Sequence, residues 1–284
     1  MAQTDMQGKV CLVTGANAGL GKATAIGLAK LGATVFLGCR DKQRGELAQA
    51  EIRAASGNEH VDLLLVDLAV QDSVRVMAAE FKKKYDLLDV LINNAAVFKS
   101  GRTVTADGLE TMFATNHLGP FLLTNLLLER LKTSAPSRIL TITAPSTTKL
   151  NFDDLQGEKK FSAFQAFGAS KACNLLFTYE LARRLKGTGV SANAIYPGLV
   201  KSALMKEAVV PVRWLTSLIS TDPEKAAEAV VYYASSPEVE GKTGLFFKGR
   251  QVIESSAYTK DEAVQRRLWD VMNPGLKARG LQMG

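Results

Sequence analysis

Short apolar runs alternate along most of the chain with longer segments in which apolar residues recur at helical spacing. Short runs bounded by turn residues are typical of buried strands, and the longer segments are typical of amphipathic helices. The pattern predicts strands at 10–14, 35–38, 61–66, 90–92, 139–143 and 191–195. It predicts helices at 20–31, 42–55, about 73–84, about 106–132 and about 162–186.

This alternation of strands and helices is typical of βαβ units, which place their strands in a parallel sheet. Right-handed crossovers would wind the sheet in both directions, with helices on both faces. We therefore expect a single Rossmann-type α/β domain over residues 1–284, with about seven strands. Prolines such as Pro136 and Pro197 fall in loops and do not mark a domain boundary.

The composition agrees with one globular domain, because 46% of the 284 residues are hydrophobic and 22% are charged. The net charge of +7 is scattered, and no basic run is longer than Lys82–Lys84. We therefore expect no nucleic-acid partner: the charges are typical of solvated helix faces, or alternatively attract an anionic cofactor weakly.

The cysteines and the lengths of the apolar runs indicate in which cellular compartment the protein is expected. Cys11, Cys39 and Cys173 are an odd set without metal-ligand spacing, which is typical of a reduced, intracellular protein. The first residues, 1–8, carry no signal-peptide core, and no apolar run approaches the length of a membrane span. We expect a cytoplasmic protein without a membrane span and without a bound metal.

A glycine-rich segment follows the first predicted strand and opens the first predicted helix. It reads from Thr14 to Gly21 and contains Gly15, Asn17, Gly19 and Leu20. Glycines let the backbone approach a pyrophosphate, and the helix N-terminus offers free N–H groups to it. The segment indicates a dinucleotide site, although an ordinary strand–helix turn has the same composition.

The end of the second predicted strand bears on the choice between NAD(H) and NADP(H). An acidic residue there would bind the ribose 2′-hydroxyl, but the position holds Cys39 and is followed by Arg40. An arginine can meet a 2′-phosphate through charge-assisted hydrogen bonds, so we expect NADP(H). Asp41 suits the alternative role of N-cap for the next helix.

With further motifs, the chain resembles the short-chain dehydrogenase/reductase family over about residues 8–272, and within it the retinol-dehydrogenase and protochlorophyllide-reductase-like group. The segments that carry the resemblance are Thr14–Gly21, Cys39–Asp41, Asp67–Leu68, Asn93–Ala96, Asn116–Gly119, Ser170–Lys171, Asn174–Phe177 and Tyr196–Gly198.

The resemblance implies which further residues contact the cofactor. In the family, the residue at Asp67 lies at the adenine, and Asn93 to Ala95 line the floor of the cofactor site. Ser202 stands where the family usually has a threonine that contacts the nicotinamide amide. The cofactor positions implied beyond the glycine segment and Arg40 are Asp67, Leu68, Asn94, Ala95, Lys171, Pro197, Gly198, Val200 and Ser202.

The family's catalytic residues are an asparagine, a serine, a tyrosine and a lysine. Asn116 and Lys171 match, whereas Ala144 stands at the serine position and Phe167 at the tyrosine position. A positioned acid contributes roughly 10²–10⁴ to a rate and one oxyanion donor about 10²–10³, so ordinary carbonyl reduction should be strongly impaired.

Three explanations of the altered site remain open. The chain is an atypical NADP(H)-dependent reductase whose proton comes from Ser146, a nearby threonine or the substrate itself. Alternatively, it binds the cofactor without turnover, as a sensor or scaffold. Thirdly, Ala144 and Phe167 are deliberate substitutions in an active reductase. A non-redox reaction in the same pocket is a further alternative.

The substrate and the assembly are indicated less directly. Residues 200–220 resemble the family's substrate lid and are apolar, which suits a bulky, apolar small molecule. Phe161, Phe164 and Phe167 recur at three-residue spacing, either as helix packing or as an apolar substrate wall.

The helices at about 106–132 and 162–186 resemble the family's interface helices, which implies a homodimer or homotetramer. We expect His117 to be structural.

Overall fold

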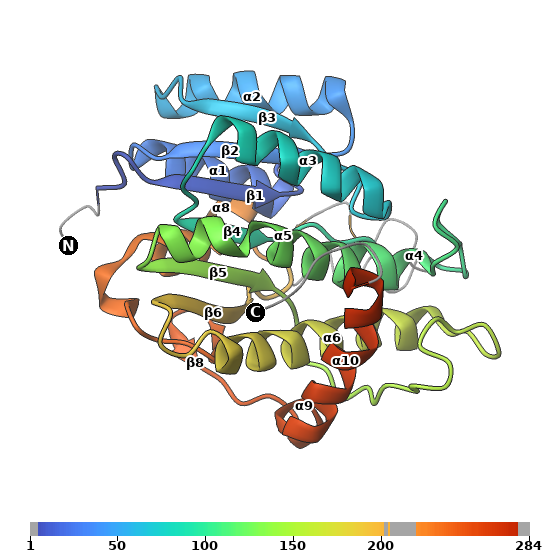
Figure 1. The fold of residues 1–284 in the computed structure, drawn as a ribbon. Coiled ribbons are helices and arrows are strands. Elements are labelled where there is room, and N and C mark those ends of the chain that lie inside the picture. Colours follow the sequence, from blue (N-terminus) through green and yellow to red (C-terminus); the bar gives the residue numbers. More distant parts are fainter. Residues whose placement is uncertain (1–4, 202–203, 205–219, 278–284) are drawn as a thin grey trace.

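One eight-stranded sheet forms the centre of the structure, a computed structural model that describes residues 5–201, 204 and 220–277. The strand order is β3-β2-β1-β4-β5-β6-β7-β8 (Figure 1). The strands are β1 (Val10–Thr14), β2 (Thr34–Cys39), β3 (Val61–Leu65), β4 (Val90–Asn93), β5 (Ser137–Ile142), β6 (Val190–Tyr196), β7 (Phe246–Lys248) and β8 (Gln251–Val252).

The first seven strands run parallel, and only the two-residue β8 pairs antiparallel with β7. This confirms the predicted doubly wound sheet. Every residue of β1 is buried, because helices cover both faces of the sheet. The sequence pattern therefore showed continuous apolar runs at the central strands instead of an alternation of polar and apolar residues.

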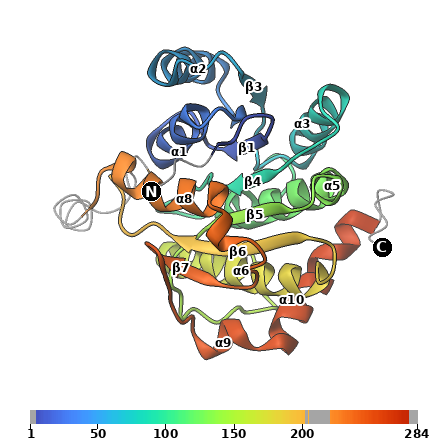
Figure 2. The same ribbon diagram turned by 90° about the vertical axis from the view of Figure 1, so that its left-hand side faces the viewer.

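Helices pack on the two faces in separate layers (Figures 1 and 2). One layer contains α1 (Gly19–Lys30), α2 (Lys42–Ser56) and α8 (Pro223–Ser235); the other contains α3 (Gln71–Lys84), α5 (Gly119–Thr133) and α6 (Ala163–Arg184). Each layer shares a buried apolar cluster with the sheet. No helix within the described ranges is long and apolar enough to cross a membrane.

The strand order reverses beside β1, which lies between β2 and β4. From β1 the chain winds outward to β2 and β3, and from β4 it winds in the opposite direction. In an open α/β sheet, the carboxyl ends of the strands at such a reversal are the usual ligand position. The glycine segment 14–21 and residues 93–96 both lie at this edge.

The predicted helix at about 106–132 begins later than the sequence pattern indicates. Gly108 has a φ of +77°, which continues no helix, and helical structure begins with α4 (Thr111–Phe113). The Glu110 carboxylate caps this start by accepting hydrogen bonds from the N–H groups of Met112 and Phe113, at 2.9 and 2.6 Å. A π-helical turn, η1 (Ala114–Leu118), then leads into α5.

A C-terminal helix that the sequence analysis did not predict covers the outer side of α6. It is α10 (Glu262–Lys277), preceded by the short helices η2 (Pro237–Val239) and α9 (Ala257–Lys260). Trp269 of α10 is 2% exposed, with its ring centroid 5.1 Å from that of Phe121 and 6.0 Å from that of Phe177. The Arg184 guanidinium lies 4.4 Å from the Trp269 ring centroid. As a result, the middle of α6 is buried on nearly every side.

Candidate functional site

The glycine segment after β1 is fastened to the loop after β4. The Thr14 hydroxyl accepts hydrogen bonds from the N–H groups of Asn94 and Ala95, at 3.0 and 3.2 Å. The Asn94 side-chain amide donates to the Thr14 carbonyl at 2.8 Å. Gly15 has a φ of +67°, and a Cβ there would lie 2.9 Å from the Ala95 Cα. The two loops therefore touch through backbone, with no room for a side chain.

The first turn of α1 is open to an anion. Gly21 is required for close packing, because a Cβ there would lie 2.4 Å from the Gly15 carbonyl oxygen. Ala18 precedes the helix in an extended conformation and offers no side-chain cap, and the first turn has no acidic residue. Its N–H groups and the positive end of the helix dipole are thus available to a pyrophosphate. Asn17, Gly19 and Leu20 lie in this same turn.

At the end of β2, Asp41 caps a helix and Arg40 is left exposed. Asp41 is the N-cap of α2 and accepts a hydrogen bond from the Arg44 N–H at 3.0 Å, as the alternative interpretation predicted. Cys39 is buried and its thiol bonds to the Ala16 backbone; burial raises the pKa of Cys39 to about 11. Arg40 is exposed and makes no ion pair with a residue that the structure describes.

The remaining predicted cofactor residues lie in the loops at the carboxyl ends of β3 and β6. The Asp67 carboxylate accepts a hydrogen bond from the Ala69 N–H at 2.9 Å, which holds the turn after β3, and Leu68 is buried. Pro197 and Gly198 leave β6, and Gly198 has a φ of +83°. Val200 forms a bridge with Thr221. Ser202 lies outside the described residues, as does most of the predicted lid at 200–220.

Lys171 and Phe167 lie one turn apart on α6, with the Lys171 Nζ 5.1 Å from the centroid of the Phe167 ring. The lysine is 6% exposed, and burial lowers its pKa to about 8. Its ammonium has no hydrogen-bond or ion-pair partner among residues 5–201, 204 and 220–277. A buried charge is ordinarily paired, so this amine is held in an unfavourable environment.

Asn116 is in the π-helical turn and is fixed against two other segments. Its side-chain oxygen accepts from the Val97 N–H at 2.8 Å, and its amide donates to the Val97 carbonyl at 3.0 Å and to the Ser170 hydroxyl at 3.1 Å. Ser170 in turn donates to the Phe167 carbonyl at 2.7 Å. The structure therefore brings Asn116 to α6 beside Phe167 and Lys171, as the motifs predicted.

The segment after β5 packs on the first half of α6 but presents no free hydroxyl at Ala144. The Ser146 hydroxyl donates to the Gly168 carbonyl at 2.8 Å and accepts from the Thr148 N–H at 3.2 Å. A Cβ at Gly168 would lie 2.4 Å from the Thr148 hydroxyl, so this contact requires glycine. The Ser146 proton is engaged here with the backbone; its role as a donor to substrate stays a prediction.

Three phenylalanine rings form a continuous aromatic run that ends at Lys171. The ring of Phe98 lies 5.4 Å from that of Phe164 and 5.6 Å from that of Phe167. Phe164 is 52% exposed, whereas Phe98 is 4% exposed. The most buried ring, Phe98, is thus in the middle of the run, and the partly buried Phe167 is the ring beside the Lys171 amine.

The predicted structural role of His117 is confirmed. It is buried, its Nδ1 lies 3.2 Å from the Asn174 Oδ1, and burial lowers its pKa to about 4. Its ring packs among Phe113, Phe121 and Phe177. The free thiols of Cys11, Cys39 and Cys173 are buried, and the described residues hold no cluster of metal-ligating side chains.

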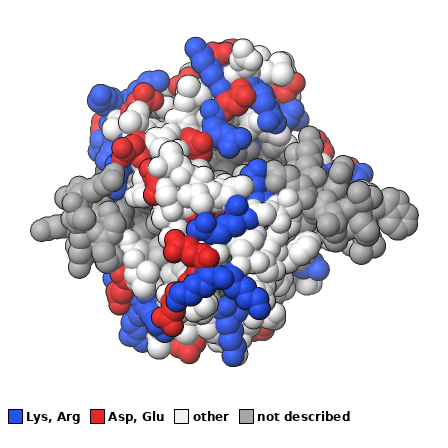
Figure 3. Space-filling model, turned by 90° about the vertical axis from the view of Figure 1, so that its right-hand side faces the viewer, with Lys and Arg blue, Asp and Glu red and all other residues white. Residues whose placement is uncertain are grey.

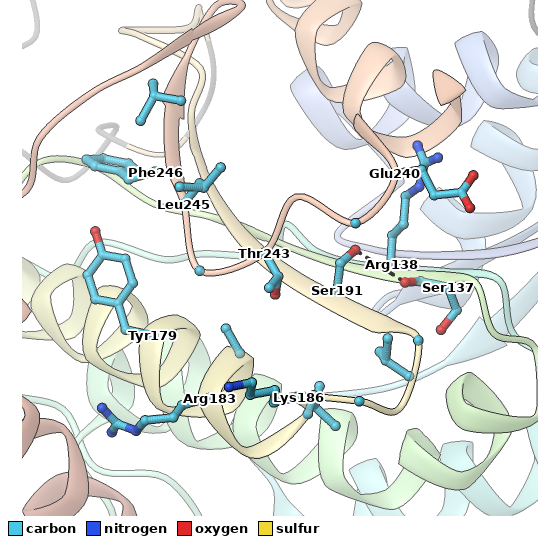
Figure 4. A pocket seen from close by; sticks show the side chains of 18 of the residues that line it. Ser137, Arg138, Tyr179, Arg183, Lys186, Ser191, Glu240, Thr243, Leu245 and Phe246 are labelled. Carbon is cyan, nitrogen blue, oxygen red and sulfur yellow. Dashed lines mark hydrogen bonds between the residues drawn. The ribbon is translucent and has the colours of Figure 1, made fainter. Parts of the chain in front are cut away.

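A separate hollow lies away from these residues. A hollow of about 720 Å³ opens between the C-terminal half of α6 and the amino ends of β5 and β6, and contains none of the predicted site residues (Figure 4). Its serines are engaged locally, since the Ser191 hydroxyl donates to the Ser137 carbonyl. At the opposite, carboxyl edge of the sheet, acidic and basic side chains are interspersed, without a patch of one sign (Figure 3).

Comparisons with known proteins agree with this geometry. The family model for short chain dehydrogenase matches residues 9–211. Retinol dehydrogenase 11 of Mus musculus is 44% identical over 275 residues, covering 95% of this chain and 87% of that protein. Retinol dehydrogenase 14 of Homo sapiens is 42% identical over 287 residues, covering 94% and 85%.

Solved structures show the same fold. An uncharacterised protein of Mycobacterium paratuberculosis has a TM-score of 0.79 and 32% identity, over 99% of this chain and 98% of its own. The Pseudomonas aeruginosa RhlG/NADP active-site complex has a TM-score of 0.70 and 24% identity, over 90% and 98%.

The buried Lys171 charge should reduce stability at neutral pH. A pKa lowered from 10.5 to about 8 corresponds to about 3 kcal/mol, imposed fully below pH 8 and relieved as the pH rises toward 10.5. Lys171→Met should therefore raise the free energy of unfolding by about 1–3 kcal/mol at pH 7, and by less at pH 10. Urea denaturation at both pH values measures this, with the exposed Lys83→Met as the control. An equal effect at both pH values would contradict the assignment.

Proposed function

The chain belongs to the short-chain dehydrogenase family of oxidoreductases, and on that premise we propose that it reduces a bulky, apolar carbonyl compound with NADPH, using a non-standard proton source. The observation that carries the proposal is the position of Lys171. This buried amine is retained beside Asn116 and at the end of an aromatic run, although the tyrosine and serine positions hold Phe167 and Ala144.

The preference for NADPH rests on the end of β2. No carboxylate is free there to bind a ribose 2′-hydroxyl, because Asp41 caps α2, whereas Arg40 is exposed and can reach an added phosphate. When bound, the reduced nicotinamide would supply the hydride. The residues that would hold the cofactor are those of the glycine segment, Asn94, Ala95 and Lys171.

The substrate class rests on the aromatic run. Phe164, Phe98 and Phe167 offer a wall without hydrogen-bonding groups, which suits a bulky, apolar molecule with its carbonyl directed at Lys171. The retinol dehydrogenases to which the chain is similar are named for an apolar substrate with one polar end, which agrees with this class.

The proton source in this proposal is Lys171 itself. A phenyl ring has no proton to give, and the Ser146 hydroxyl is bonded to the Gly168 carbonyl. The Lys171 ammonium, with a pKa of about 8, is largely protonated at pH 7 and acidic enough to protonate an alkoxide. After hydride reaches the carbonyl carbon, the oxygen would take this proton, and solvent would reprotonate the amine.

A cofactor-binding protein without turnover is the second candidate. It is favoured by the absence of a hydroxyl at Ala144 and Phe167, since the two groups that usually meet the carbonyl oxygen are both missing. In that case Lys171 and Asn116 would serve only to hold the cofactor. A variant of an active reductase disabled at these two positions would behave in the same way.

Assembly and location remain predictions. The homodimer or homotetramer was inferred from the helices corresponding to α5 and α6, and α10 now covers the outer side of α6 through Trp269. A homo-oligomer would therefore have to form mainly through another surface. The predicted cytoplasmic location is likewise untested.

Arg40 should account for a preference for NADPH over NADH. Arg40→Ala should weaken NADPH binding by roughly 1.5–3 kcal/mol, the value of a hydrogen bond to a charged group, and should affect NADH much less. Fluorescence titration with both cofactors measures this. Lys42→Ala, which removes an exposed charge nearby, is the matched control. Equal affinity of the unaltered protein for the two cofactors would rule the proposal out.

The identity of the proton donor can be tested by the pH dependence of the reaction and by variants at Lys171, Phe167 and Ala144. We expect NADPH-dependent reduction of apolar aromatic aldehydes to fall as the pH rises through about 8, because Lys171 loses its proton there. Lys171→Ala should lower kcat by roughly 10²–10⁴, and added methylamine should restore part of it. In the Phe167→Tyr, Ala144→Ser double variant the dependence on Lys171 protonation should weaken.

The same measurements distinguish an active reductase from a cofactor-binding protein without turnover. If Lys171→Ala leaves the turnover unchanged, the proposed mechanism is wrong. If the unaltered protein reduces nothing and the double variant reduces ordinary ketones, the chain is a cofactor-binding protein or a disabled reductase. Lys149→Ala, at an exposed lysine near the Ser146 segment, controls for general charge effects.

A further inference from the structure

We propose that Lys171 forms a covalent imine with bulky, apolar aldehydes, so that the protein captures such an aldehyde when the cofactor is absent. The aldehyde class rests on the proposed function, but capture needs no hydride and no turnover. The inference comes from three features of the structure: an amine without a polar partner among the described residues, the Phe167 ring beside it, and the exposed Phe164 at the other end of the aromatic run.

Unlike Lys9 and Lys22, Lys171 has an amine without an acceptor among the residues that the structure describes. Lys9 pairs with Asp89 at 2.8 Å and Lys22 with Glu51 at 2.8 Å, whereas the more deeply buried Lys171 has only the face of Phe167 beside it within the described ranges. An amine that is desolvated and unpaired is more readily deprotonated. Deprotonation frees the nitrogen lone pair, which is the nucleophile in imine formation.

The degree of deprotonation decides whether the reaction occurs near neutral pH. At a pKa of about 8, about one amine in ten is unprotonated at pH 7, against roughly one in 3,000 at the ordinary value of 10.5. The free-base fraction of Lys171 is thus roughly 300 times that of a surface lysine. The lowered pKa supports imine formation at Lys171, and the aromatic rings beside the amine indicate an apolar aldehyde as its ligand.

Phe167 makes the site suitable for a neutral product. The Phe167 ring presents its face to the amine and would offer the same apolar face to an uncharged imine. The aromatic run of Phe164, Phe98 and Phe167 extends outward from the same point. An aldehyde with a flat or elongated apolar body can lie along these rings with its carbonyl carbon at the Lys171 nitrogen.

The reaction balances without a co-reactant. The amine nitrogen forms a bond to the carbonyl carbon, the π electrons move to the oxygen, and a proton from the nitrogen converts that oxygen to a hydroxyl. The carbinolamine then loses water as the carbon–nitrogen double bond forms. Both amine hydrogens leave in that water, and no atom is oxidised or reduced.

The experiment uses the full chain without cofactor and biphenyl-4-carboxaldehyde as the probe. Imine is trapped with sodium cyanoborohydride, and the modified residue is located by peptide mass spectrometry. We expect one adduct, at Lys171, formed at least 10-fold faster than at any exposed lysine, with a rate that rises to a half-maximum near pH 8. Added NADP⁺ should suppress it, since the same amine is assigned to the cofactor site.

Matched variants complete the test. Lys171→Arg keeps a cation and should abolish the adduct, whereas Lys83→Arg, at an exposed lysine, should leave it unchanged. If Lys171→Arg does not fold, Phe164→Ala serves in its place. Loss of this outer ring should slow labelling by biphenyl-4-carboxaldehyde several-fold relative to labelling by propanal, which is too small to use the aromatic run.

Labelling spread evenly over surface lysines, or equal in Lys171→Arg and the unaltered chain, would overturn the proposal. So would equal effects of Phe164→Ala on the two aldehydes. Reductase turnover, measured in parallel, separates this inference from the proposed function. An adduct without turnover supports capture and refutes the reductase; turnover without an adduct refutes capture alone.

Discussion

The burial of the Lys171 amine against the Phe167 ring is the constraint on which the account of this protein depends. Desolvation of the ammonium opposes folding, so the packing around α6 must offset it. The structure supplies that packing from both sides. The sheet covers the inner side of α6, and α10 covers the outer side, where Trp269 packs on Phe177 and Phe121. Burial of α6 thereby keeps the pKa of the Lys171 amine below its ordinary value.

The loops after β1 and β4, which are expected to hold a dinucleotide, are joined without this amine. Thr14 and Asn94 join the loops after β1 and β4 by hydrogen bonds, and Gly15 and Gly21 allow those loops to approach closely. None of these contacts involves Ala144 or Phe167. Whatever chemistry takes place beside Ala144 and Phe167, the loops expected to hold a dinucleotide can therefore keep their conformation, as both candidate functions require.

The sequence predicted the sheet, and it indicated the glycine segment as a dinucleotide site, because both follow from local patterns. Buried parallel strands are continuous apolar runs, and the glycine segment combines backbone and packing requirements that glycine alone meets. The late start of the helix near Thr111 could not be predicted from periodicity, since it depends on Gly108 and on the Glu110 cap. The π-helical turn that carries Asn116 has no periodic signature either.

Other features of the structure could not be predicted from the sequence, because they depend on contacts between residues that are distant in the chain. The role of α10 lies in the packing of Trp269 on α5 and α6, far away in the chain. The hydrogen bond from Ser146 to Gly168 likewise depends on the fold, as does the absence of a polar partner for Lys171 among the described residues. The sequence identified Lys171 by its motif position and Ser146 by its nearness to Ala144, but their protonation and bonding required the fold.

Direct titration of the Lys171 amine tests the central claim. With lysine labelled with ¹³C at Cε, NMR spectra of the cofactor-free protein recorded from pH 6 to 11, with Lys171→Met for assignment, give the pKa of this one side chain. The account predicts a midpoint near pH 8, well below those of the exposed lysines. A midpoint at or above pH 10 would contradict it, because Lys171 would then be neither an effective proton donor nor a nucleophile near neutral pH.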